Sequence, residues 1–250
     1  MPMDNMKITV NPMFSGVDSF AMELHAKFES EGEVLYDRRN KVKCFKVNGL
    51  TLVVKRYKRP FLLQRLDYTF IRKSKARRAY SYALRLKDLC IDTPEAVACV
   101  EVYKHGLFDV GYFVSTYCDD PDLKILKETP DEGLIAAFAY FLVNLHSKGV
   151  LHGDLNLSNI LYRPDETEAH GYHFTVIDTN RSRFVDNPSQ RQCLRNLVRV
   201  SHDRQLNERI ISHYAQIRGW NQNECVRTVE RMLDTFEKKR RIKRKIKNKK

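Results

Sequence analysis

The chain has 250 residues, of which 42% are hydrophobic, and a formal net charge of +13. That length and apolar content can bury a sizeable core, and they favour one two-lobed unit over two independent domains. The six cysteines contain no Cys-x-x-Cys pair and four interrupt apolar or strand-like stretches, which argues against zinc and disulfide frameworks and for a reducing compartment.

The first part of the chain, residues 1–113, predicts strands and one long helix. Its start, residues 1–7, lacks the basic region and long apolar run of a secretory signal. The charged segment 36–43 falls between two strand-like segments, and the β-branched run 49–57 predicts a strand. One helix is expected over roughly residues 64–89, where apolar positions recur only partly at the helical period.

The middle of the chain predicts a change from strands to helices. Residues 112–117 form a strand-like run that enters a polar segment, so we expect a hinge at 114–120 between two lobes. A mainly helical lobe then follows over 121–236 and begins with a helix at 131–148. The apolar stretch of this helix has ten residues, too few to span a bilayer, and suits a core helix that ends before Gly149.

Residues 151–161 read Leu-His-Gly-Asp-Leu-Asn-Leu-Ser-Asn-Ile-Leu, which places Asp154 five positions before Asn159. This spacing is typical of a phosphoryl-transfer loop. The aspartate accepts the proton of the attacking hydroxyl, and the asparagine holds Mg²⁺ on the nucleotide phosphates. His152 is better explained as a packed structural histidine, and the polar residues after Asp154 have an ordinary explanation as loop caps.

Other segments supply the remaining parts of a nucleotide site in the expected order. Lys55, near the end of its strand, is the candidate for gripping the α and β phosphates of ATP. Thr116 and Tyr117, at the predicted hinge, are candidates for docking adenine. Asp178 ends an apolar strand where a second Mg²⁺ ligand is needed. Alone, a strand lysine is usually a solvated edge residue and such an aspartate a turn starter, but together these residues predict an ATP and Mg²⁺ site.

The chain resembles the lipopolysaccharide kinases of the Kdo/WaaP type, which are relatives of the protein kinases. The likeness covers the Lys55 strand, the basic segment 72–80, residues 90–97, the Asp154 loop, and residues 177–184 and 193–199. Residues 177–184 discriminate most, because ordinary kinases place Phe-Gly after the metal aspartate and this chain places Thr-Asn-Arg. The resemblance implies an α+β, two-lobed protein-kinase-like fold, with Lys55 and Asp154 catalytic and Asn159 and Asp178 as metal ligands.

Two features depart from the kinase pattern. Kinases orient the strand lysine with a helix glutamate, but residues 61–94 contain no glutamate and Ser81 stands about where one is expected. Either another carboxylate substitutes, or the lysine is held differently, or phosphoryl transfer is weakened as in a pseudokinase. The segment 36–43 also lacks the glycines of a phosphate-covering loop, so its charged tip is better explained as solvated.

The last fourteen residues, 237–250, carry ten lysines or arginines and one acid. Nine of the thirteen net positive charges therefore lie in this segment, which we interpret as a polybasic tail. An anionic membrane surface is its favoured partner, because the family resemblance implies a membrane-embedded acceptor. A solubilising role and a nucleic-acid contact are the less favoured alternatives.

These observations predict a Mg-ATP-dependent kinase that phosphorylates a sugar hydroxyl, on Kdo or a heptose, of the lipopolysaccharide inner core. The acceptor, lipid A carrying Kdo, and the cytoplasmic face of the inner membrane are implied by the resemblance. Arg181 and Arg183 are candidates for pairing with acidic groups of the acceptor. The rivals are a small atypical protein kinase or ATPase of the tRNA-modification type, against which Thr179 and Asn180 argue, and a catalytically weak pseudokinase scaffold. The oligomeric state stays open.

Overall fold

The computed structural model describes residues 5–247, and contacts along the backbone divide the chain into two compact units. Unit 1 contains the chain up to Asp119 together with Asp178–Arg181, and unit 2 contains Asp120–Ile177 and the chain from Ser182 onward. The division after Asp119 falls inside the segment 114–120 predicted as a hinge. One large sheet combined with helices confirms the predicted α+β class.

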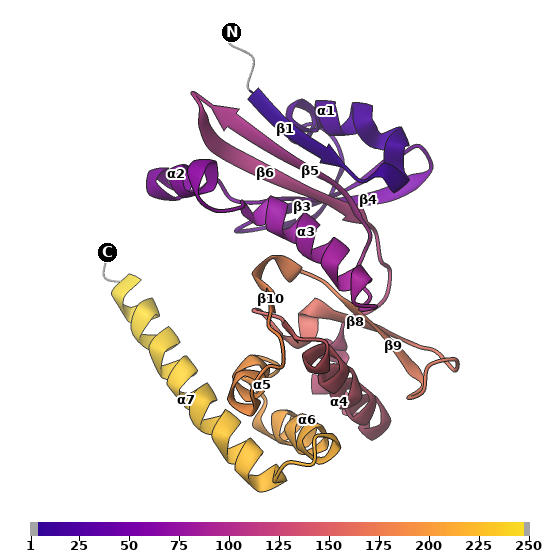
Figure 1. Ribbon diagram of the computed structural model, residues 1–250, viewed down its shortest axis with the longest axis vertical. Helices are drawn as coiled ribbons and strands as arrows, with labels where there is room; N and C mark the ends of the chain where they lie inside the picture. Colours follow the sequence, from indigo (N-terminus) through magenta and orange to yellow (C-terminus); the bar gives the residue numbers. More distant parts are fainter. Residues whose placement is uncertain (1–4, 248–250) are drawn as a thin grey trace. The chain divides into compact units, whose positions relative to one another are not determined.

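Unit 1 is built on an antiparallel six-stranded sheet with the strand order β1-β5-β6-β4-β3-β2 (Figure 1). Its strands are β1 (Asn5–Val10), β2 (Glu33–Asp37), β3 (Lys41–Val47), β4 (Leu50–Arg56), β5 (Ala96–Lys104) and β6 (Leu107–Thr116). In β5 the first seven residues are all buried, because helices cover both faces of the sheet there. Strand β4, which contains Lys55, lies inside the sheet between β6 and β3.

Two helices form the hydrophobic cores on the two faces of this sheet. Helix α1 (Asp18–Lys27), preceded by the 3-10 helix η1 (Pro12–Val17), contributes Ala21 and Leu24 to one core. Helix α3 (Lys75–Asp88) contributes Ala76 and Ala79 to the other. The sequence did not predict α1, because its buried apolar positions span about one turn and give little periodicity.

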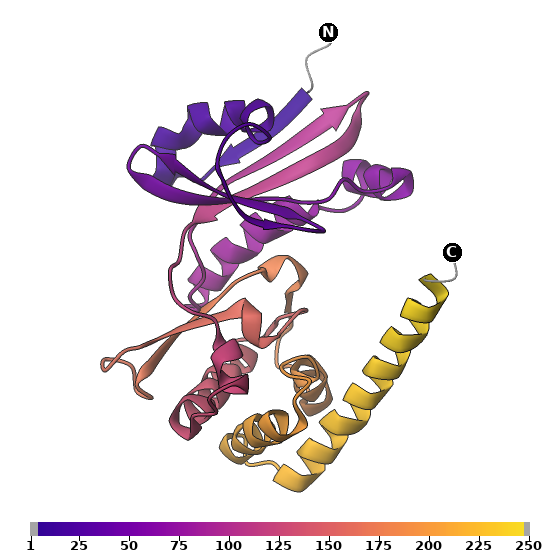
Figure 2. The ribbon, with the colours of Figure 1, turned by 180° about the vertical axis from the view of Figure 1, so that it is seen from behind.

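The predicted single helix over 64–89 is wrong. The structure has two helices in this segment, α2 (Leu62–Phe70) and α3, with a break between them (Figure 2). Ser74 marks the start of the second helix, since its side-chain oxygen accepts a hydrogen bond from the Arg77 amide at 3.1 Å and caps α3. An N-cap of this kind begins a new helix rather than continuing the previous one.

Unit 2 contains a buried apolar helix that leads directly into the candidate loop. This helix, α4 (Glu132–Ser147), is capped by Asp131, whose side chain accepts from the Leu134 amide at 2.6 Å. It ends before Gly149, which has a φ of +75°. A Cβ there would lie 2.5 Å from the Val185 carbonyl oxygen, so only glycine fits this turn.

Short elements after α4 frame the loop that contains Asp154 and Asn159. They comprise β7 (Val150–Leu151), η3 (Leu157–Asn159), β8 (Ile160–Pro164), β9 (Tyr172–Val176), η4 (Thr179–Arg181) and β10 (Arg183–Phe184). Strand β7 pairs with β10 and β8 pairs with β9, so the loop leaves one two-stranded sheet and enters another. The 3-10 helix η2 (Leu123–Lys127) precedes α4.

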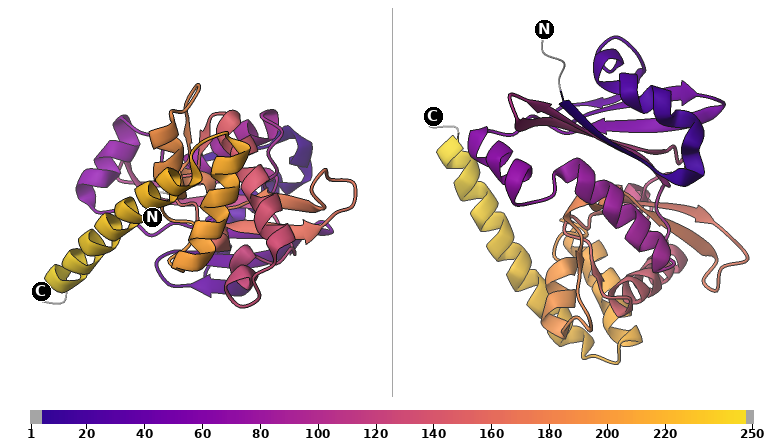
Figure 3. Two further views of the ribbon diagram at one scale, coloured as in Figure 1. Left: turned by 90° about the horizontal axis from the view of Figure 1, so that it is seen from below. Right: turned by 45° about the horizontal axis from the view of Figure 1, so that its top comes forward.

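The chain then forms α5 (Gln190–Leu197), α6 (Arg204–Ile217) and the long helix α7 (Gln222–Lys247), shown in yellow in Figure 3. Helix α7 has 26 residues, so position 237 marks no structural division and the described part of the polybasic segment is helical. Lysine and arginine are good helix formers, which explains this continuation. Residues 248–250 of the predicted tail lie outside the described residues. None of the helices in the described part of the chain has the length and apolar character needed to cross a membrane.

Candidate active site

Lys55 and Asp178 lie together in unit 1. The Lys55 Nζ is 2.8 Å from Asp178 Oδ1, and the two side chains are 19% and 30% exposed. The ring centroid of Tyr57 lies 5.5 Å from the same ammonium, and burial, followed by the Asp178 charge, raises the pKa of Tyr57 well above its ordinary value. A carboxylate from the segment after β9 therefore partners the strand lysine, in place of the helix glutamate that the sequence lacks.

The backbone at Asp178 has an unusual conformation. Its φ is +57°, in the left-handed region that residues other than glycine rarely occupy. The side chain of Asn180 donates a hydrogen bond to Asp178 Oδ1, and Arg78 Nε donates to the Asn180 carbonyl at 3.1 Å. Helix α3 thus fastens the turn that presents the carboxylate, and such conformations cluster at functional sites.

Basic side chains gather around Asp178. Lys75, the first residue of α3, has a pKa lowered first by burial and then by the charges of Arg39, Arg181 and Arg78, with Asp178 opposing. An excess of cations around one carboxylate fits a polyphosphate bound together with a divalent cation. Sequence reasoning did not single out Lys75, although its position at a helix start within a basic segment was a usable signal.

The predicted adenine residues lie at the end of β6, beside the strand that carries Lys55. Thr116 is the last residue of β6, and its hydroxyl accepts from the Glu95 amide at 2.9 Å. Tyr117 is 43% exposed, and its hydroxyl donates to Asp119 at 3.1 Å. The structure therefore places both residues at the edge of unit 1 where the chain leaves for unit 2.

The loop with Asp154 and Asn159 folds back on itself in unit 2. The Asn159 side-chain amide donates to the Asp154 carbonyl at 2.8 Å, and the Asn156 amide donates to the same oxygen at 3.2 Å. The Asn159 carbonyl accepts from the Ile177 amide at 2.9 Å, which ties the loop to the end of β9. The structure thus brings Asp154 and Asn159 together, and the Asn159 Oδ1 is the kind of oxygen that Mg²⁺ prefers.

His152 supports this loop from inside the unit. It is 1% exposed, its Nε2 lies 3.0 Å from the Ile177 carbonyl, and its Nδ1 accepts from the Asp154 amide at 3.3 Å. This arrangement fits the structural role expected from the sequence.

A second buried histidine extends the support into the helical core. The His146 Nε2 lies 3.0 Å from Asn196 Oδ1 and its Nδ1 lies 2.8 Å from the Tyr214 hydroxyl. Asn196 in turn donates to the His152 carbonyl at 2.9 Å. Burial lowers the pKa of His146 to about 4, so the histidine is neutral at neutral pH. The predicted base is thereby connected through neutral hydrogen bonds to α4, α5 and α6.

Arg199, just after α5, forms an ion pair with the predicted base. Its Nη2 lies 2.5 Å from Asp154 Oδ1, and its Nη1 donates to the Gly153 carbonyl at 3.3 Å. The guanidinium also lies 5.5 Å from the ring centroid of Phe236 on α7. Sequence reasoning missed this role, because 45 positions separate the two residues and no motif links them.

The two arginines predicted to bind the acceptor fall in different units. Arg181 is the last residue of η4 in unit 1, and Arg183 begins β10 in unit 2, where it pairs with Leu151. Both are exposed. Their role toward the acceptor stays a prediction.

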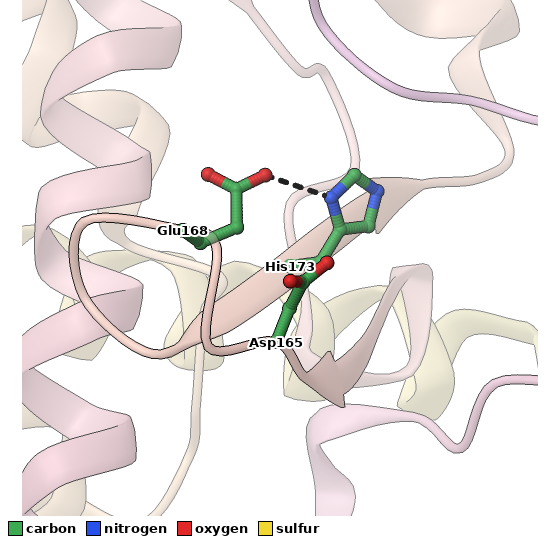
Figure 4. Close-up of side chains that lie close together, drawn as sticks. All are labelled: Asp165, Glu168 and His173. Carbon is green, nitrogen blue, oxygen red and sulfur yellow. Dashed lines mark hydrogen bonds and ion pairs between the residues drawn. The ribbon is translucent and has the colours of Figure 1, made fainter.

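A separate cluster occupies the tip of the β8–β9 hairpin (Figure 4). Ligand atoms of Asp165, Glu168 and His173 lie within 4.8 Å of one another. Glu168 Oε1 is 3.1 Å from His173 Nδ1, and hydrogen bonds from Thr167 lower the pKa of Asp165. These contacts within one exposed turn account for the cluster, and we assign no metal to it.

The middle of the chain, residues 114–216, matches the model of the Lipopolysaccharide kinase (Kdo/WaaP) family. The resemblance predicted from the sequence is thereby confirmed. A solved structure described as WaaP in complex with acyl carrier protein aligns with 93% of this chain and 97% of that chain, at 19% identity and a TM-score of 0.59. A Rio2 kinase–ADP/Mg²⁺–phosphoaspartate complex from Chaetomium thermophilum aligns with 89% of this chain and 77% of its own, at 16% identity and a TM-score of 0.48. No curated protein matches the chain.

The family match and the alignment with WaaP indicate the class of protein. The alignment with WaaP covers nearly the whole chain and confirms the predicted protein-kinase-like fold. The family match includes the Asp154 loop, Asp178 and Arg199, and it identifies the chain as a phosphotransferase of the kinase type.

Proposed function

We propose that the chain is a Mg-ATP-dependent kinase that phosphorylates a sugar hydroxyl, on Kdo or a heptose, of the lipopolysaccharide inner core. The observation that carries this proposal is the Asp154 loop, in which the Asn159 amide is folded onto the backbone of the predicted base at 2.8 Å. That geometry suits a loop that supplies both a base and a metal ligand.

The residues of unit 1 fit the nucleotide. Lys55 and Lys75 would contact phosphate oxygens, and the Asp178 carboxylate would be a Mg²⁺ ligand. The side-chain Oδ1 of Asn159, in unit 2, is the other predicted Mg²⁺ ligand. Thr116 and Tyr117 would contact the adenine. When bound, ATP supplies the phosphoryl group, and Mg²⁺ neutralises part of the charge on the phosphates.

The residues of unit 2 fit the proton transfer. Asp154 would accept the proton of the sugar hydroxyl. In the same step the hydroxyl oxygen would bond to the γ-phosphorus of ATP, and the bond from that phosphorus to ADP would break. Arg199 holds the Asp154 carboxylate in place, and the asparagines keep the loop in one conformation. Arg181 and Arg183 would pair with acidic groups of the acceptor.

The basic end of α7 fits a location at the inner face of the inner membrane. Exposed bases near an anionic leaflet are each worth about 1 kcal/mol at most, so several together are needed for binding. Ile242 and Ile246, 48% and 58% exposed, lie four residues apart on this helix and would add an apolar contact. The WaaP of the solved structure is in complex with an acyl carrier protein, which makes such a protein a further partner to test against α7.

The pseudokinase alternative has less support than the sequence alone gave it. It rests on the missing helix glutamate, and Lys55 has the carboxylate partner Asp178 at 2.8 Å. The tRNA-modification alternative keeps the sequence argument against it, since Thr179 and Asn180 follow the metal aspartate.

The test combines nucleotide binding with phosphoryl transfer. We expect ATP with Mg²⁺ to raise the melting temperature of the chain, and the chain to transfer labelled phosphate from ATP to purified lipid A carrying Kdo. Asp154→Asn should reduce the transfer by roughly 10³-fold, because a general base contributes on this scale, and should leave folding intact. Asp165→Asn, at the exposed hairpin tip, is the matched control. Transfer by Asp154→Asn at the wild-type rate would contradict the assigned base.

A further inference from the structure

Helix α2 and its flanking residues expose an apolar face in unit 1. The exposed fractions are 69% for Phe61, 58% for Leu62, 72% for Leu63, 38% for Leu66, 75% for Phe70 and 82% for Ile71. Positions 62, 63, 66 and 70 follow the i, i+1, i+4, i+8 spacing of one helix face. A contiguous apolar patch of this kind marks an interaction surface rather than ordinary surface.

The polar residues of α2 hold the helix to the sheet. Arg65 Nε donates to the Phe108 carbonyl at 2.7 Å, and the Phe108 amide donates to the Thr69 hydroxyl at 2.9 Å. Tyr68, 7% exposed, meets the Phe108 ring edge-on at 5.4 Å, and Arg65 lies 3.3 Å from Asp109. Figure 3 shows α2 beside the sheet of unit 1. The helix is therefore inverted: its polar residues face protein and its apolar residues face outward.

Basic residues flank the apolar face on both sides. Between positions 56 and 75 the bases are Arg56, Lys58, Arg59, Arg65, Arg72, Lys73 and Lys75. The only acid in this stretch is Asp67, which lies 3.6 Å from Arg72. Lys58 and Arg59 before the helix, and Arg72 and Lys73 after it, are exposed.

The apolar face of α2 and the bases at its two ends together indicate what kind of partner binds there. An apolar face favours an apolar phase, and the exposed bases at both ends favour negative charge at its boundary. The boundary between lipid headgroups and acyl chains offers both at once, whereas a nucleic acid offers the charge without the apolar phase.

We propose that α2 is an interfacial helix that inserts its apolar face into the surface of an anionic lipid bilayer. Leu62, Leu63, Leu66 and Phe70 enter the headgroup boundary, and the flanking bases contact lipid phosphates. The contact is made by residues of unit 1 alone and requires no nucleotide or sugar acceptor. It goes beyond the proposed function, so the two stand or fall independently.

The experiment measures partitioning of the full chain onto vesicles of phosphatidylcholine mixed with phosphatidylglycerol, by cosedimentation. Leu63→Glu together with Phe70→Glu should lower the partition coefficient by roughly 30-fold, because two large apolar side chains no longer enter the boundary. The matched control is Met13→Glu together with Met22→Glu, which makes the same change of charge at residues that are 79% and 59% exposed in the same unit. This control should bind within about twofold of wild type.

A second measurement places the contact on α2 itself. In Phe70→Trp, tryptophan emission should shift to shorter wavelength on adding the mixed vesicles and much less with pure phosphatidylcholine. Wild-type binding by the double glutamate variant would overturn the proposal, since α7 would then account for the affinity. A lipid-free wild-type dimer that the same substitutions dissociate would also overturn it, because a second copy would be the occupant. Thermal denaturation of each variant confirms that the exposed substitutions leave the fold intact.

Discussion

The two units hold their candidate site residues by different kinds of interaction. In unit 1, Lys55 and Asp178 hold each other as a partly exposed ion pair. In unit 2, neutral hydrogen bonds from asparagine and histidine side chains fix the loop around Asp154. A partly exposed ion pair is weak and can exchange partners, whereas a buried neutral network is costly to break. This difference indicates that the Lys55–Asp178 pair in unit 1 can exchange its contacts for a ligand, whereas the loop around Asp154 in unit 2 is already formed before a ligand binds.

The largest expected effect comes from breaking the ion-paired half. Lys55→Met removes the cation beside Asp178 and the candidate phosphate contact, so kcat/KM for ATP should fall roughly 10³-fold. Steady-state kinetics of phosphate transfer measure this effect. Lys46→Met, an exposed change on the neighbouring strand β3, should leave the kinetics unchanged.

The pair is expected to act as one element. Asp178→Asn alone should cost about as much as Lys55→Met, and the double variant little more than either, because residues that act together are not additive. Losses that multiply in the double variant would show that the two residues act independently.

The buried neutral histidine of unit 2 should make the stability of the folded chain sensitive to acid. His146 has a pKa lowered to about 4 from its ordinary 6.5, so the unfolded chain binds this proton more readily than the folded one. The stability that depends on neutral His146 is complete above pH 6.5, falls as the pH drops, and is gone below about pH 4. Urea unfolding should show a loss of about 2 kcal/mol from this group between pH 7 and pH 5.

The control for this pH effect removes the titrating group. His146→Gln should be less stable at pH 7 but should lack this part of the acid-induced loss. His105→Gln, at an exposed turn of unit 1, should keep the wild-type pH dependence. An unchanged pH profile in His146→Gln would mean that other groups cause the acid sensitivity.

The smallest expected effect concerns the ion pair between Arg199 and Asp154. Arg199→Gln removes the ion pair to Asp154 and the hydrogen bond to Gly153, so kcat should fall about tenfold while the melting temperature changes little. Arg195→Gln, one turn earlier, is the matched control. A higher kcat in Arg199→Gln would instead show that the arginine restrains the base.

Sequence reasoning performed best where the pattern was local. The helix before the loop and its end before Gly149 depend on neighbours within a few positions, and the structure shows both. It failed over residues 64–89, where the hydrophobic period continues weakly through a break. The capping oxygen of Ser74, a local signal that the periodicity does not include, begins a second helix there.

By itself the sequence determined the spacing of Asp154 and Asn159 in their loop and the order of the candidate residues along the chain, and the resemblance to a known family implied the class of fold. Only the tertiary structure decided which carboxylate partners Lys55, which arginine reaches Asp154 and which face of α2 points outward. Those contacts join positions between about 40 and 120 residues apart, and no local periodicity encodes which of many chemically suitable partners the folded chain brings within reach.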